Sequence, residues 1–451
     1  MTHLLVRITL LSVFLAGCAQ PILLENPAPV EPRTPVTAMR PKAHAIGVVS
    51  RPEGAMQPRA ENVARLTLQQ ALELAERLHP ALTASQAEIT GAAGRALQAG
   101  LFPNPELVAR IEAAPLNDRF TEQADYIVGV SQPVPLGGRL SAARQVEVAD
   151  QNRLRYEHDS TRLDIRRQVQ QNFATALYWQ RVTQTRAEDV EIAANGVTVA
   201  NARLEAGDAI PAEVAQAEIE QHRAQVNLER ARSRQQQAME ALAVAVGAPT
   251  LEVGALEGAL EPPSAVPAFE ALSSQLKANP VAAAAEAAVA VQQARVDLVH
   301  ARRIPDIALD LAYRRIGDID NAVDVGVRMP LALFDRQQGA LHEARSALVA
   351  AEALAQVREN ELLLELRTAY GTLTRALDTV TQLRQIILPR AEGVLRVTET
   401  RYTTGDVSLS ELLPVRRDWT ELRLHYLDAL HEVNQAWAAL SPYVKESNPS
   451  Q

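Results

Sequence analysis

Side chains that could carry out catalysis or hold a metal ion are few in this chain and form no recognisable set. The sequence lacks the phosphate-binding pattern G-x-x-x-x-G-K-[ST], the nucleophile pattern G-x-S-x-G and the zinc pattern H-E-x-x-H. Its 9 histidines and 5 methionines are scattered. His425 and His431 fall on different faces of one predicted helix, where we expect both to be solvated. We therefore predict a protein that is not an enzyme and has no cofactor or metal site of its own.

Cys18 is the residue whose surroundings predict a specific covalent chemistry. It is the only cysteine of the chain, so it cannot form an internal disulfide. It follows Arg7 and an apolar run over residues 8–16, which is typical of an export signal and too short to span a bilayer. The stretch LAGC, ending at Cys18, resembles a bacterial lipobox, in which the cysteine is acylated. An inert cysteine beside a cleavage site is the alternative.

Composition narrows the class of protein. The chain has 47% hydrophobic but only 4% aromatic residues, which favours long helices packed on thin seams over a bulky enzyme core. Its net charge of -9 and the absence of a basic stripe argue against a nucleic acid partner. We expect residues 1–17 to be a lipoprotein signal peptide and the proline-rich residues 18–65 to be a lipid-anchored tether.

One charged pattern, R-x-x-x-G-D-x-x-x-x-E, is present twice, in RLEAGDAIPAEV and in RYTTGDVSLSEL. The similarity extends outward from both stretches, so that the chain contains two copies of one unit. We place the first copy at residues 66–246 and the second at 267–440, joined by a linker at 247–266 and followed by a tail at 441–451. The pattern therefore belongs to the repeated unit.

Long helices must position the repeated pattern. Residues 139–206 and 336–404 each predict one very long helix, and the last helix of each copy has apolar positions at alternating steps of three and four, as in a coiled coil. The pattern is then the tip of a helical hairpin. Gly207 and Gly405 would supply the left-handed residue that ends the first helix, and Asp208 and Asp406 would help to start the returning helix. A plain two-helix coiled coil is the alternative.

Four segments have the alternation of strands instead, about residues 106–114, 126–134, 306–315 and 322–331. Each has one apolar and one polar face and the length of a tilted membrane strand. Soluble antiparallel sheets alternate in the same way, so a soluble sheet remains an alternative. Four strands cannot close a barrel, and an open edge in lipid is costly. A membrane sheet would therefore require several chains.

At this point the sequence resembles a known family, the TolC-like outer membrane efflux proteins, and within it the CzcC/CusC-type heavy-metal efflux lipoproteins. The residues that carry the resemblance are LTLQQALELAERLHPAL, QAGLFPNPEL, SQPVPLGGR and the two tip patterns. The resemblance implies a mostly α fold with membrane β strands. It also implies a homotrimer, with a twelve-stranded outer membrane β-barrel continued by a twelve-helix α-helical barrel across the periplasm.

The resemblance also implies roles for individual residues. A periplasmic membrane-fusion adaptor would dock on the tips, at Arg203, Gly207, Asp208, Arg401, Gly405 and Asp406. Glu411 would lie in an acidic ring at the pore entrance, and Tyr402 and Glu213 would form links that hold the entrance shut. Pro414 replaces a second carboxylate of the family's ring, which would thin that ring. For the tip residues, capping alone is the alternative role.

The resemblance implies a passive exit duct, which is the outer membrane component of a tripartite efflux system. Its partners would be the periplasmic adaptor, an RND-type transporter in the inner membrane, and the lipid of the outer membrane. The cargo would be heavy-metal cations. Drug efflux and type I secretion would use nearly the same duct. A periplasmic lipoprotein scaffold of coiled coils with a small soluble sheet is the alternative from a different class. The expected location is the outer membrane of a Gram-negative bacterium, with a lipid anchor and an extension through the periplasm.

We predict that Cys18 carries lipid. Cys18→Ser should abolish acylation and lipoprotein-type processing, because no other thiol is available. Mass spectrometry of the mature wild-type protein should find acyl chains on Cys18, and an unmodified thiol there would refute the prediction.

Overall fold

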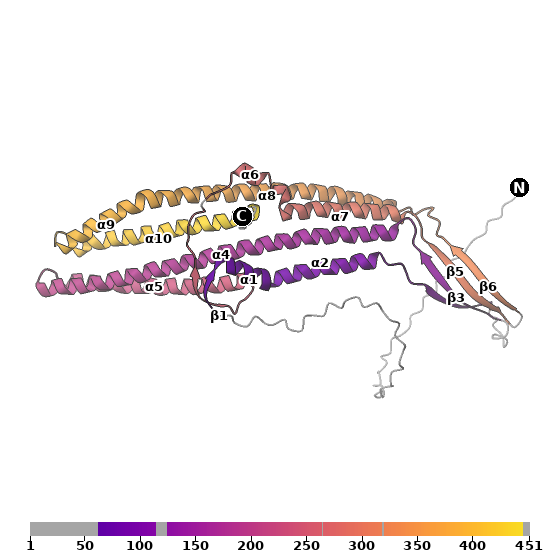
Figure 1. The fold of residues 1–451 in the computed structure, drawn as a ribbon, viewed down its shortest axis with the longest axis horizontal. Coiled ribbons are helices and arrows are strands. Elements are labelled where there is room, and N and C mark those ends of the chain that lie inside the picture. The colour runs from indigo at the N-terminus through magenta and orange to yellow at the C-terminus, as the bar shows by residue number, and fades with distance from the viewer. Residues whose placement is uncertain (1–61, 114–123, 264, 318–319, 445–451) are drawn as a thin grey trace, which may run out of the picture. The chain divides into compact units, whose positions relative to one another are not determined.

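The computed structural model describes residues 62–113, 124–263, 265–317 and 320–444, so Cys18 lies outside it. Two similar series of elements follow one another (Figure 1). The first comprises α1 (Leu68–Leu78), α2 (Pro80–Ala99), β2 (Glu106–Glu112), β3 (Asp125–Val134), α4 (Arg139–Ala206) and α5 (Pro211–Val246). The second comprises α6 (Phe269–Ser273), η1 (Leu276–Ala278), α7 (Pro280–Arg302), β5 (Ile307–Ile316), β6 (Asp320–Arg328), α8 (Gln338–Gln382), η2 (Leu383–Ile387), α9 (Leu388–Thr403) and α10 (Leu409–Leu440), before the short turn η3 (Ser441–Tyr443).

Equivalent side chains start α2 and α7 in the two copies. His79 Nδ1 accepts a hydrogen bond from the N–H of Ala81 at 3.2 Å, and Asn279 Oδ1 accepts one from the N–H of Val281 at 2.9 Å. A proline follows each cap at the first helical position, where no amide donor is needed. The duplication thus extends to the local chemistry that begins these helices.

The two long helices differ in continuity. α4 runs without interruption for 68 residues. Its counterpart, expected as one helix over 336–404, begins at Gln338 and passes through the five-residue π turn η2 between α8 and α9. Pro389, at the start of α9, has no N–H, and its ring clashes with the carbonyl group one turn earlier in a regular helix. A wider turn relieves that clash.

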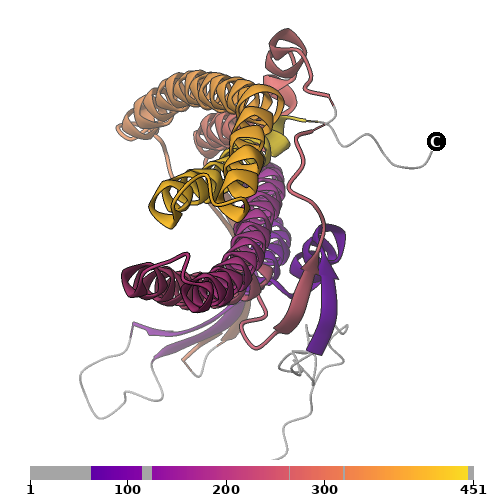
Figure 2. The same cartoon turned by 90° about the vertical axis from the view of Figure 1, so that its left-hand side faces the viewer.

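Two antiparallel hairpins form the end of the helical layer that lies away from the four-stranded sheet, while nearer the sheet α2 and α7 pack on α4, and α8 packs on α7 (Figure 1). α4 returns into α5, and α9 returns into α10, and the order across the layer is α5, α4, α10, α9, with each helix in contact with the next (Figure 2). α5 packs through the small and aliphatic seam positions that the coiled-coil pattern predicts, including the buried Ala217, Leu228, Ala231, Ala238 and Leu242. α5 and α9 are the outer members of this series.

The apolar core of the helical layer is divided along its length. One large cluster joins α4, α5, α8 and α10 around such fully buried residues as Val169, Leu242, Leu366 and Val433. A separate tip cluster comprises Ala200, Ala217, Tyr402, Val407, Leu409, Leu412 and Leu413. Both clusters contain residues of both hairpins, so apolar packing holds the hairpins together at two levels.

The four predicted strand segments form one antiparallel sheet in the order β2-β3-β5-β6. Its register aligns Leu107, Val130, Leu311 and Val325 in one row across all four strands. These side chains are exposed by 79, 46, 59 and 79% respectively. The adjacent row contains Val128, Tyr313 and Val323, also exposed. We call this the apolar face of the sheet.

The opposite face of the sheet is charged. Arg314 Nη1 lies 3.5 Å from Glu112 and 3.3 Å from Asp125, and its Nη2 lies 2.9 Å from Asp324. One arginine therefore connects all four strands. Ion pairs of this kind hold side chains in register on one face, while the apolar face has no cover from any described element.

A second, two-stranded sheet was not predicted from the sequence. β1 (Asn62–Thr67) pairs in parallel with β4 (Glu252–Glu257), in regions expected to be tether and linker. Gln180 of α4 anchors β4, since its Nε2 donates to the Leu256 carbonyl at 3.0 Å and its Oε1 accepts from the Leu256 N–H at 2.9 Å. Two six-residue strands far apart in sequence leave little periodic signal.

Two glycines with the same backbone conformation provide a test of the packing. Gly207 and Gly247 both have φ of 82°, but a Cβ on Gly247 would lie 2.7 Å from the His79 Cα, whereas one on Gly207 would meet nothing within 4 Å. We predict that Gly207→Ala costs about 1 kcal/mol and that Gly247→Ala costs about 2–4 kcal/mol. Thermal unfolding followed by circular dichroism measures both, and equal losses would contradict this packing.

Candidate functional site

The two hairpin tips have the same backbone geometry. Gly207 and Gly405 are left-handed, with φ of 82° and 84°. The N–H of Asp208 donates to the Arg203 carbonyl at 2.8 Å, and the N–H of Asp406 donates to the Arg401 carbonyl at 2.9 Å. These bonds close the C-terminal ends of α4 and α9. The expected role of the glycines in ending the helices is thus confirmed.

The expected role of the aspartates in starting the returning helices is wrong. The residue before α5 is Ile210 and the residue before α10 is Ser408, and neither helix has a side-chain cap. The Asp406 carboxylate instead accepts a hydrogen bond from Thr404 Oγ1 at 3.0 Å. The aspartates lie two residues too early to reach the free amides of the next helix, and they remain exposed on the tips.

Arg203 and Tyr402 connect the two tips. The Arg203 guanidinium carbon lies 4.9 Å from the centre of the Tyr402 ring, a cation–π distance. Tyr402 is only 5% exposed and belongs to the tip cluster. Its contacts place the end of α9 against the first hairpin.

Three buried polar atoms at the tips have no hydrogen-bond partner within the described residues: Arg203 Nη1, Glu213 Oε2 and Tyr402 Oη. The expected link between Tyr402 and Glu213 is therefore not formed in a single chain. Buried unpartnered polar atoms are costly, so three of them together mark a place where groups outside this chain, or a different arrangement of the tips, would complete the hydrogen bonding.

The duplicated tips are not equivalent in their side chains. Leu204 of the first tip occupies the position that Tyr402 has in the second. Arg203 is engaged with Tyr402, and its Nη2 also donates to the Asp208 carbonyl at 3.3 Å. Arg401 is exposed, and its side chain has no hydrogen bond or ion pair with any described residue. The second tip therefore presents an uncommitted guanidinium group.

Glu411 lies in the first turn of α10 and is exposed. Its Oε1 accepts a hydrogen bond from Ser408 Oγ at 3.2 Å, and a carboxylate is stabilised at this end of a helix. Pro414 follows inside the same helix and cannot donate to the carbonyl group one turn earlier. Of the two carboxylates that the family resemblance expects at positions 411 and 414, this chain has only Glu411.

A polar seam between the hairpins was missed by the sequence reasoning. Arg417 of α10 binds Glu220 of α5 at 2.6 Å. Further along α10, Thr420 Oγ1 donates to Asp189 at 2.9 Å and Arg423 pairs with Glu188 at 2.7 Å. The spacing of these α10 residues by three is visible in the sequence, but nothing there identifies their partners on α4 and α5.

The seam contains a carboxyl group with a shifted pKa. Burial raises the pKa of Asp189, and the hydrogen bond from Thr420 and the charge of Arg186 act in the opposite direction. The seam lies between the tip cluster and the large core cluster, so the hairpins are joined here by polar contacts.

His431 is not solvated as expected. Its ring stacks on Tyr178 with 4.8 Å between ring centres, and its Nε2 lies 3.1 Å from Thr175 Oγ1 and 3.0 Å from Gln435 Nε2. Burial lowers its pKa, so the ring is neutral near pH 7. His425 is exposed, as expected. Two histidines with such different surroundings form no shared site.

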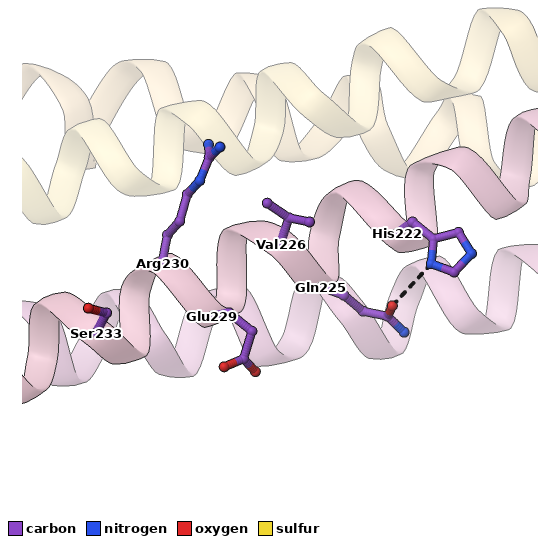
Figure 3. A pocket seen from close by; sticks show the side chains of 6 residues that line it. All are labelled: His222, Gln225, Val226, Glu229, Arg230 and Ser233. Carbon is purple, nitrogen blue, oxygen red and sulfur yellow. Dashed lines mark hydrogen bonds between the residues drawn. The ribbon is translucent and has the colours of Figure 1, made fainter.

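A shallow groove of about 510 Å³ follows one stretch of α5. Figure 3 shows its lining residues, His222, Gln225, Val226, Glu229, Arg230 and Ser233, all from this helix. Arg230 and Val226 point toward the neighbouring helices, and His222 pairs with Gln225 at 3.2 Å. No second element converges on it with polar groups, so the groove has the form of a helix face and not of an enclosed ligand site.

Two kinds of feature are absent from the described residues. No group of three or more histidine, cysteine, aspartate or glutamate side chains in this part of the chain is arranged to hold a metal ion. Among its helices, none combines the length and apolar character required to cross a bilayer.

Comparisons with known proteins identify the fold and the family. The cobalt-zinc-cadmium resistance protein CzcC of Cupriavidus metallidurans is 29% identical over 374 residues, covering 82% of this chain and 88% of that protein. A solved membrane protein from Pseudomonas aeruginosa matches with a TM-score of 0.69 and 17% identity, covering 83% of this chain and 89% of that one. Crystal structures of CusC match with a TM-score of 0.64 and 16% identity, covering 83% and 91%.

These structural matches are too distant in sequence to say more than that the fold is shared. The family comparison says more, because the description of the outer membrane efflux protein family matches residues 67–248 and 271–444, which include both copies of the repeated unit and both tips. The resemblance to this family and to its heavy-metal resistance members is thus confirmed, and the chain belongs to the outer membrane efflux protein family.

Proposed function

We propose that this protein is the outer membrane channel of a tripartite efflux system, a passive exit duct that opens to the outside of a Gram-negative cell. The observation that carries the proposal is the apolar face of the sheet. Rows of exposed side chains cross four strands in register, and the reverse face carries the charges. Lipid on one side and water on the other would suit these two faces.

The two unpaired edges of the sheet support a trimer. An edge strand in hydrocarbon leaves backbone groups unsatisfied at a cost of several kcal/mol each. Three copies of a four-stranded sheet would give twelve strands and no edge, in a size that leaves room for an aqueous lumen. At the tips the helical layer has two outer members, α5 and α9, which would join those of neighbouring copies into a periplasmic tunnel.

Heavy-metal cations are the proposed cargo, and an RND-type transporter in the inner membrane is the proposed source of energy. Support comes from the relative CzcC, whose name refers to cobalt, zinc and cadmium resistance. A duct needs no tight ligand set, because cargo must leave as readily as it enters. The proposal therefore assigns no metal site and no catalytic step to this chain.

We propose that the tips are the periplasmic entrance and that a membrane-fusion adaptor docks there. Arg203, Gly207, Asp208, Arg401, Gly405 and Asp406 would form the docking surface. The exposed Arg401, without a partner among the described residues, makes the second tip the stronger attachment for an acidic or carbonyl-rich adaptor loop. The lipid on Cys18 would add an anchor in the outer membrane.

At the entrance, Glu411 would contribute one carboxylate from each copy to a ring that attracts cations. Tyr402 and Glu213 would control the width. The contact between Tyr402 and Arg203 holds the hairpins together within one chain, and the unpartnered Tyr402 Oη and Glu213 Oε2 are available for a bond that forms in the assembled or shut entrance.

The membrane assignment predicts different outcomes for adjacent positions on β5. Leu311→Arg should destabilise the inserted protein by about 2–4 kcal/mol, because Leu311 lies at the middle of its strand on the apolar face. Ala312→Arg adds the same charge on the other face, opposite Asp324, and should insert normally. Heat-modifiable gel mobility and yield in the outer membrane fraction measure both variants. Equal tolerance would favour a soluble sheet and refute the proposal.

The entrance proposal predicts changes in single-channel current. Tyr402→Ala should raise conductance in planar bilayers, because it removes both the ring that packs under Arg203 and the hydroxyl group proposed to bond in the shut entrance. Tyr402→Phe removes the hydroxyl group alone and should raise conductance by less. In the same recordings Glu411→Gln should lower cation preference without lowering the amount of trimer. Wild-type currents from both Tyr402→Ala and Glu411→Gln would place the constriction elsewhere.

A further inference from the structure

The apolar alternation of β6 continues beyond the point where its pairing stops. β6 pairs with β5 as far as Arg328, opposite Ala308. The next odd-numbered residues, Met329, Leu331 and Leu333, continue the apolar series and are exposed by 51, 71 and 62%. They have the side-chain pattern of a membrane strand but no strand partner within the described part of the chain.

At the other edge of the sheet, β2 begins two residues short of that level. Glu106, the first residue of β2, is aligned through Ser131 and Asp310 with Gly326 of β6. In the same way Leu107 is aligned with Val325. If the sheet closed with no displacement between copies, Leu107 of the neighbouring copy would meet Val325, and residues 329–333 would have no partner.

Barrel geometry requires a displacement. Strands about 4.8 Å apart that tilt by about 35–45° from the barrel axis shift by about 1–1.5 residues of ~3.3 Å for each strand crossed. From β2 of one copy to β2 of the next there are four crossings, which gives about four to six residues. The shift must be even, because an odd shift would turn the apolar side chains of one strand to the other face.

Only one direction of this displacement leaves β2 with a partner strand. In one direction, β2 lies opposite residues 324–330 or 326–332. In the other, it lies opposite residues 316–322 or 314–320, where β5 ends and the hairpin turn begins. β5 already has strands on both sides, so this second direction is excluded.

We propose that residues 329–333 extend β6 and pair with β2 of a second copy, so that Leu107 of the neighbouring copy lies opposite Met329 or Leu331. This rests on the trimeric barrel proposed above and specifies the seam between its subunits. The seam would continue the apolar face without interruption, because odd-numbered residues on both strands point to lipid.

Charge favours the shorter displacement. A shift of four places Arg328 opposite Val108 of the neighbouring copy, while a shift of six places it opposite Arg110, and like charges directly opposite one another are destabilising. Leu107 is then opposite Met329. Pro330 has no N–H, but alternate residues of a strand direct their amides to opposite neighbours, so the proline removes at most one donor from the pairing with β2.

Cysteine pairs at the seam test the register. The full-length protein would carry Leu107→Cys with Met329→Cys, Leu107→Cys with Leu331→Cys, or, as the matched control, Leu107→Cys with Val325→Cys. Residues directly opposite lie within the Cα separation of about 4.4–6.8 Å that a disulfide needs, and a four-residue offset adds about 13 Å. Each variant would be oxidised in outer membranes and compared on non-reducing gels with its single-cysteine parents.

A covalent trimer should form from the Met329 pair, or from the Leu331 pair, at least about ten-fold more than from the Val325 control, and reduction should return it to monomer. An equal or larger yield from the Val325 control would overturn the displacement. If wild type is trimeric by native electrophoresis but no pair cross-links, the proposed seam is wrong while the channel proposal stands. A monomeric wild type would overturn both.

Discussion

A sheet that lies in a membrane must satisfy every backbone N–H and C=O group without water, and under the proposed membrane assignment this constraint governs the four-stranded sheet. The sheet of one chain has four strands and two edges, so it is incomplete as a membrane structure. Its charged face is internally compensated, since Arg314 alone contacts acidic groups from the other three strands. Within the described residues, β2 and β6 each have one edge without a neighbouring strand, and the other copies of the proposed trimer would supply the missing pairing.

The helical layer faces a different requirement, because its backbone bonds are satisfied within each helix. In the helical layer, the strength of the contact between the two hairpins differs along their length. The apolar core is divided into a large cluster and a tip cluster, with ion pairs and hydrogen bonds between them. The Arg417–Glu220 and Arg423–Glu188 pairs are partly exposed, and such pairs contribute on the order of 1 kcal/mol or less each, so this stretch aligns the hairpins mainly through the direction of its polar contacts.

The sequence was sufficient where periodicity or a single backbone requirement decides the structure. Alternation in the strand segments predicted the sheet, and the glycines of the repeated pattern predicted how α4 and α9 end. The sequence was insufficient where a strand or side chain pairs with a residue that lies far away in the chain. The pairing of β1 with β4 and the partners of Arg417 and Arg423 depend on contacts across some 200 residues. The π turn before Pro389 depends on a local feature, because the proline is present in the sequence. However, either a kink or a wider turn can accommodate a proline within a helix, so the sequence does not decide between them.

The duplicated tips show how two copies of one motif acquire different properties. Both keep the glycine, because the left-handed turn at the end of a long helix permits little else. The residue after the arginine is under no such restriction, and it differs: Leu204 in one tip, Tyr402 in the other. The tyrosine ring attracts Arg203 from the opposite tip and leaves Arg401 uncommitted. The difference at this position therefore goes with two different arginines, Arg203, which joins the hairpins, and Arg401, which has no side-chain partner among the described residues.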